Sequence, residues 1–174
     1  MPSKDMHNKQ MIKDGKVIDN EWQLLSTYED ASTVIIPQGK VIVHFDILQQ
    51  QAELLERDDI GVFINNDADL SIIAEKIIQR PLIAINFPVF MDGRGFSLAR
   101  LLRERYHYQG ELRAVGHLIR DQLCYLQRCG FNAFSFDGSD DGIDLNAALA
   151  SLSDFTEAYQ SSVEKPEPLF RRRA

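Results

Sequence analysis

The sequence predicts an α/β fold in which five consecutive strand–helix units form a mainly parallel sheet. From Val41 onward, short apolar runs alternate with amphipathic segments at intervals of about twenty to thirty residues, which is typical of βαβ architecture. Before this region, Asp14-Gly15 stands between two short extended runs and indicates a β-hairpin. We therefore expect an α/β domain preceded by an N-terminal hairpin arm.

The strands alternate in polarity, and this pattern bears on which of two arrangements the sheet adopts. Leu112 and Ala114 alternate with Arg113, and Phe134 and Phe136 flank Ser135, so one face is apolar and the other is partly polar. Helices on one side only, as in part of a (βα) barrel, produce this asymmetry. A flavodoxin-like doubly wound sheet buries both faces and is the alternative. The pattern favours the partial barrel and leaves the doubly wound sheet open.

The elements follow in order from these patterns. The expected strands cover residues 41–45, 61–65, 82–87, 111–115 and 132–136. The expected helices cover about 47–57, 68–79, 96–106 and 118–129, and Asp144 caps a last one. We assign residues 1–32 to a tail and the hairpin arm, 33–160 to a single α/β domain, and 161–174 to a flexible tail.

The arm contains apolar residues that need a partner. Trp22, Leu24 and Leu25 follow the hairpin, and we expect them to pack across an open face of the main sheet or on a second copy of the chain. The arm is thus a candidate contact for a homo-oligomer.

Composition indicates an ordinary globular protein. The chain has 174 residues, of which 44% are hydrophobic and 26% charged, and it carries a net charge of −7. The negative charge argues against binding to nucleic acid or to an anionic membrane. The polar stretch 1–16 is neither a secretory signal nor a membrane span, so we expect a cytoplasmic protein.

No cofactor or metal is predicted. Cys124 and Cys129 are five positions apart on one expected helix, which is not a metal-binding spacing, and we interpret both as buried thiols. The chain has no dinucleotide-binding fingerprint and no iron–sulfur or haem motif. His44 lies inside an apolar strand, and we interpret it as a hydrogen-bonded core histidine.

The loop after the third strand is the first candidate site. It contains Asp92, Gly93, Arg94 and Gly95, and the helix begins near Ser97. Glycines let backbone N–H groups approach an anion, the helix N-terminus adds partial positive charge, and an arginine donates two parallel hydrogen bonds. The alternative is a turn in which Asp92 or Ser97 caps the helix and Arg94 pairs with a carboxylate.

Polar residues at the carboxyl ends of the strands extend this candidate site. In parallel sheets, functional groups gather at these ends. We predict anion binding by Gly93, Arg94, Gly95, Ser97 and Arg113. The predicted polar partners are Asn86, Asp92, His117 and Asp137. The alternative is that Arg113 pairs on the surface with a nearby carboxylate such as Glu111.

The amino-acid sequence of the central region closely resembles that of a bacterial family of unknown function. Members of this family are usually described as oxidoreductases involved in sulfite reduction. The residues that carry the resemblance are 83–88, 92–97, 99–103, 110–116, 120–123 and 129–134. The resemblance implies a place in sulfite reduction because genes of the family neighbour a sulfite or nitrite reductase. It implies no catalytic residues.

Together, the resemblance and the arginine-bearing loops favour an accessory protein of assimilatory sulfite reduction that binds the reductase or a small oxyanion. The alternative is a small enzyme or oxidoreductase acting on a sulfur- or phosphorus-containing anion. The sequence leaves open whether the protein is catalytic.

Overall fold

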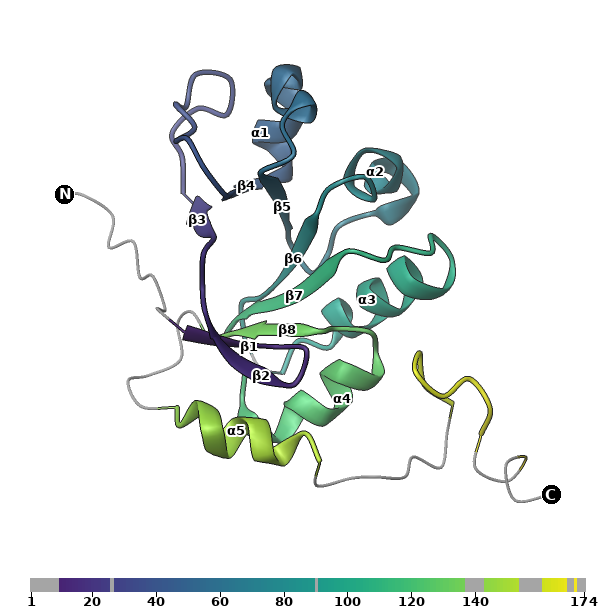
Figure 1. The fold of residues 1–174 in the computed structure, drawn as a ribbon. Coiled ribbons are helices and arrows are strands. Elements are labelled where there is room, and N and C mark those ends of the chain that lie inside the picture. Colours follow the sequence, from purple (N-terminus) through teal and green to yellow (C-terminus); the bar gives the residue numbers. More distant parts are fainter. Residues whose placement is uncertain are drawn as a thin grey trace.

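The computed structural model describes residues 10–25, 27–89, 91–136, 143–153, 161–168 and 171, and within these residues eight strands form one sheet (Figure 1). The strands are β1 (Gln10–Lys13), β2 (Lys16–Asp19), β3 (Gln23–Leu25), β4 (Val41–His44), β5 (Ile60–Ile64), β6 (Leu82–Phe87), β7 (Glu111–Gly116) and β8 (Ala133–Ser135). The α-helices are α1 (Phe45–Gln50), α2 (Leu70–Ile77), α3 (Arg94–Glu104), α4 (Leu123–Arg128) and α5 (Leu145–Ser151). Two short 3₁₀ helices cover Ala52–Glu56 and Arg120–Gln122.

The sheet is mixed, with a parallel centre and an antiparallel edge. Its strand order is β2-β1-β8-β7-β6-β5-β4-β3, and neighbouring strands from β3 to β8 are parallel. The hairpin β1–β2 joins this set through an antiparallel pairing of β1 with β8. The predicted α/β class is confirmed, but the sheet is not purely parallel because the hairpin is part of it.

The sheet curls into a half-barrel, and the chain itself requires this shape. β2 and β3 lie at opposite edges, yet they are joined only by residues 20–22. Four Cα-to-Cα steps, from Asp19 to Gln23, span at most about 15 Å. In a flat sheet, seven strand spacings would separate these edges by about 34 Å. The edges must therefore approach each other at one end. The strand order also differs from that of a flavodoxin-like sheet, because β3 to β8 follow one another in sequence order without a reversal.

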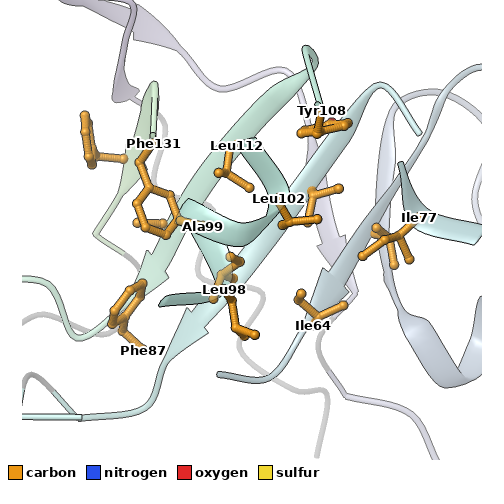
Figure 2. Packing of buried hydrophobic residues seen from close by; sticks show 14 of the residues in the cluster. Ile64, Ile77, Phe87, Leu98, Ala99, Leu102, Tyr108, Leu112 and Phe131 are labelled. Carbon is orange, nitrogen blue, oxygen red and sulfur yellow. The ribbon is translucent and has the colours of Figure 1, made fainter. Parts of the chain in front are cut away.

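The main hydrophobic core lies between the outer face of the half-barrel and the helices, which follow that side in Figure 1. Figure 2 shows its centre, where α3 places Leu98, Ala99 and Leu102 against the sheet. Phe87 and Leu112 face α3 from β6 and β7, and both are fully buried. The apolar positions of α3 recur at the three- and four-residue spacing of one helix face, which explains why this segment is helical and where it packs.

The inner face has a smaller core that the N-terminal segment covers. Ile42, Phe63, Leu82, Ala84 and Val115 form this cluster, and Trp22 and Leu24 pack against it. Of the two expectations for the arm, packing across an open face of the sheet is thus observed within one chain. The sequence did not predict that Gln23–Leu25 would be a strand, and the structure pairs it in parallel with β4.

The strand bounds agree most closely at the centre of the sheet. β6 has the predicted limits, and β7 extends one residue further, to Gly116. The first expected helix is split into α1 and a 3₁₀ turn, and the fourth begins with a 3₁₀ turn at Arg120. Helix ends and tight turns depend on local hydrogen bonds that the apolar pattern does not report.

We predict that Gly95→Ala destabilises the fold through a clash with Phe87. A Cβ at position 95 would lie 2.6 Å from Cζ of Phe87, a fully buried ring that also contacts Phe96 and Phe131. Overpacking of this kind costs about 1–3 kcal/mol, which urea unfolding measures.

Gly93→Ala is the matched control. Its nearest neighbour would be 3.7 Å away and its φ is −79°, so the change should alter the free energy of unfolding by less than about 1 kcal/mol. Equal losses in the two variants would contradict the packing role of Gly95.

Candidate functional site

The loop between β6 and α3 is built around an ion pair of Asp92 and Arg94. Oδ1 of Asp92 accepts hydrogen bonds from the main-chain N–H of Arg94 at 3.2 Å and from its Nε at 3.0 Å. Oδ2 accepts a hydrogen bond from Nη2 at 2.6 Å. The hydrogen bond from Arg94 lowers the pKa of Asp92 far below its usual value, and Asp92 in turn raises the pKa of Arg94. Asp92 therefore supplies the negative charge at the N-terminus of α3, and much of the Arg94 guanidinium is already engaged.

The neighbouring predicted residues have different environments. Gly93 is exposed, and a Cβ there would make only an ordinary contact with Phe96 at 3.7 Å. Gly95 packs directly on the Phe87 ring, so its small size serves packing rather than close approach of an anion. Ser97 is exposed on the first turn of α3. The pairing of Arg94 with a carboxylate, which was part of the alternative, is thus observed, although the N-cap of α3 is Gly93 and neither Asp92 nor Ser97. The Arg94 side chain is still 60% accessible, so part of its guanidinium is exposed.

Arg113 lies inside β7 rather than at its carboxyl end. It pairs with Ala84 in the strand register and is 2% exposed. Its Nε lies 2.7 Å and its Nη2 2.6 Å from Oε1 of Glu111, and Nη1 donates to Asn20 at 3.1 Å. Lys13 binds the other oxygen of Glu111 at 2.7 Å. This buried network ties β7 to the hairpin and to the link before β3.

Two of the remaining predicted polar partners, His117 and Asn86, lie at the carboxyl ends of the strands, which we call the rim of the half-barrel. His117 is exposed just after β7, and its main-chain N–H donates to the carbonyl of Phe87 at 2.9 Å. Asn86 is half-buried at the end of β6 and donates to Asn65 at 3.4 Å. Asp137 lies outside the described residues. The predicted residues therefore do not converge on one anion: Arg94 is engaged at the rim, and Arg113 is in the interior.

His44 occupies the end of β4 and caps α1, which sequence analysis did not anticipate. Its Nδ1 accepts the main-chain N–H of Asp46 at 3.2 Å and lies 3.3 Å from Oδ2 of the same residue. Tyr28 donates to that carboxylate at 2.9 Å. His44 is 17% exposed, so it is a partly accessible end-of-strand residue rather than a core histidine.

Two adjacent rim loops expose apolar side chains. Val89 and Met91 follow β6 and are 55% and 80% exposed, and Ile119 follows β7 and is 40% exposed. The loops begin side by side because the N–H of His117 binds the carbonyl of Phe87. We call Val89, Met91 and Ile119 the rim patch. An exposed apolar patch bordered by charged residues is typical of a protein contact.

Within the described part of the chain, no three His, Cys, Asp or Glu side chains are grouped to hold a metal ion.

None of the helices in the described ranges has the length and apolar character needed to cross a membrane.

A comparison with family models identifies the chain. Residues 61–170 match a model described as a bacterial protein of unknown function, DUF934. The chain belongs to this family. The match begins in β5 and includes β6, β7 and β8 with the rim loops between them. No curated protein and no solved structure matches the chain.

We predict that the two arginines proposed for anion binding differ sharply in their effect on stability. Arg113→Ala leaves Glu111 buried with its main partner removed, and this costs about 3 kcal/mol. Arg94→Ala removes an exposed ion pair and costs no more than about 1 kcal/mol. Chemical unfolding of both variants tests the difference, and similar losses would contradict the structural role of Arg113.

We predict that the stabilising effect of Asp92 disappears in acid. Because its folded pKa is lowered, its contribution is complete above the unfolded pKa of about 3.9 and is lost as pH falls below that value. The difference in unfolding free energy between the parent and Asp92→Asn should thus be largest near pH 6 and shrink toward pH 2. In an Arg94→Met background, where the cause of the shift is absent, the same comparison should show little dependence on pH.

Proposed function

We propose that the protein is an accessory protein of assimilatory sulfite reduction and that it acts by binding the reductase through the rim patch. The pathway rests on the sequence resemblance. The mode of action rests on one observation, which is the exposure of Val89, Met91 and Ile119 on two adjacent loops of the half-barrel.

The loop that contains Val89 and Met91 has internal hydrogen bonds. The N–H of Asp92 binds the carbonyl of Val89 at 3.1 Å, and the Asp92–Arg94 pair fixes the next turn to the start of α3. A preorganised loop loses less conformational entropy on binding than a flexible one does. Exposed apolar side chains on such a loop have the properties of the central contacts of an interface, with Arg94 and His117 at its polar border.

The contacts of the arginines favour a protein partner over a free oxyanion. An oxyanion at Arg94 must compete with the carboxylate of Asp92, which already takes two guanidinium nitrogens. An anion at Arg113 must displace Glu111 from a buried pair. The enzyme alternative needs the same arginines to face a substrate, so it has less support than the binding role.

We predict that the purified protein binds the assimilatory sulfite reductase of the same bacterium and that a Val89→Asp, Met91→Asp double variant binds at least tenfold more weakly. A charge placed at the centre of an apolar interface must be desolvated without a partner. Biolayer interferometry with immobilised protein measures the affinity.

Ile72→Asp is the matched control. Ile72 is 74% exposed on α2, outside the rim patch, and its replacement should leave binding unchanged. Failure of the parent to bind the reductase, together with normal growth of a deletion strain on sulfate, would overturn the proposed function. Binding that survives the double variant would overturn the role of the rim patch.

A further inference from the structure

Three polar side chains from neighbouring strands form a row on the inner face of the half-barrel. His44, Asn65 and Asn86 come from the ends of β4, β5 and β6, and we call them the polar row. His44 pairs with Phe63 in the strand register, and Phe63 lies two positions before Asn65 in the chain. Asn86 pairs with Val115, which belongs to the inner cluster. Residues two apart in a strand face the same side, so all three side chains belong to the inner face.

The hydrogen bonds inside the row are long, and the cap of α1 uses only Nδ1 of His44. Asn86 Nδ2 lies 3.4 Å from Oδ1 of Asn65, and Asn65 Nδ2 lies 3.5 Å from Nε2 of His44. Good hydrogen bonds of this type measure about 2.7–3.2 Å. Each asparagine offers two N–H donors and two acceptor lone pairs, so the row has hydrogen-bonding capacity to spare. Asn65 is exposed and Asn86 is half-buried, which leaves this capacity accessible.

The row borders the inner cluster. Phe63 pairs with His44, and Ala84 and Val115 neighbour Asn86 in the sheet. These three side chains are buried under the N-terminal segment, so the polar row stands at the edge of an apolar core. Gly116, with φ of +106°, lets β7 approach β6 closely, because a Cβ there would lie 2.5 Å from the carbonyl oxygen of Phe87 and 3.1 Å from Oδ1 of Asn86. Polar side chains beside apolar ones are a usual lining of a site for a small organic molecule.

The charges around the row select against an anion. Asp46 contacts His44 at one end of the row, and Arg94, in the loop after β6, is engaged by Asp92. Adjacent parallel strands are about 4.8 Å apart, so the two amides stand side by side and present donors and acceptors along one line. An asparagine amide recognises a partner that carries a donor and an acceptor next to each other, as on the edge of adenine. The aromatic rings of Tyr28 and Phe63 flank His44 at centroid distances of 5.8 and 5.7 Å and add apolar ring contacts.

We propose that the polar row is a binding site for a small, uncharged, planar ring that presents a hydrogen-bond donor beside an acceptor, the chemistry of a nucleobase. The amides of Asn65 and Asn86 bind the polar edge of the ring, and His44 bonds through Nε2. This site is separate from the rim patch, and it does not depend on the binding of a reductase.

The test uses the full chain with adenosine and uridine as neutral probes and adenosine monophosphate as the charged one. Titration followed by NMR of the His44 ring and the asparagine side-chain amides should show shifts at His44, Asn65 and Asn86 for at least one nucleoside. Calorimetry should show at least tenfold weaker binding in Asn65→Ala and in Asn86→Ala. Asn146→Ala, an exposed asparagine on α5, is the matched control and should bind as the parent does.

The outcomes separate clearly. Thermal unfolding establishes that each variant is folded before its binding is measured. Binding of adenosine monophosphate without binding of either nucleoside would overturn the uncharged class, because it would show that the phosphate is recognised. No shifts with any probe, or shifts that persist in both asparagine variants, would overturn the site.

Discussion

The link between Asp19 and Gln23 is the constraint on which the rest of the structure depends. It joins strands at opposite edges of an eight-stranded sheet with three residues, and no flat arrangement allows this. The link also supplies Asn20, whose side chain accepts from Arg113, and Trp22, which covers the inner cluster. Curvature, burial of the inner face and the position of the buried ion pair are thus consequences of one short segment.

This constraint divides the inner face into two parts with different chemistry. Near the amino ends of the strands, the link and the Lys13–Glu111–Arg113 network close the face with paired charges. Near the carboxyl ends, His44, Asn65 and Asn86 have weak mutual contacts and remain accessible. The paired charges thus lie at one end of these strands and the accessible polar side chains at the other, and complete (βα) barrels likewise separate stability from function.

The fold was predictable where the apolar pattern is strong. β6 and β7 are long and alternate regularly, and the asymmetry of their faces correctly indicated helices on one side. β3 was missed because three residues are too few to show a period, and its strand character comes from pairing with β4. The antiparallel place of the hairpin beside β8 depends on a contact between distant parts of the chain, which local patterns do not contain.

The site residues were harder to predict because the charge of a side chain does not show which residue it pairs with. Arg113 was placed in the anion site, with pairing to Glu111 on the surface as the alternative. The pair forms, because Glu111 lies two positions earlier on the same face of the strand, but it is buried rather than on the surface. Gly95 was interpreted as room for an anion, and the room is taken by Phe87. Asn65 was not singled out, although it and Asn86 both stand at the ends of consecutive strands on the inner face. Comparing equivalent positions across strands would have found them together.

The pairing of Ile12 with Phe134 also fixes the order in which the sheet is completed during synthesis. The hairpin leaves the ribosome first, but its partner strand β8 emerges only after the whole parallel set has been made. Contacts between such distant segments form late because the intervening chain must first be ordered. The N-terminal hairpin therefore exposes Met11 and Ile12, both fully buried in the finished fold, throughout elongation. Apolar surface that stays exposed in this way favours aggregation until the last strand arrives.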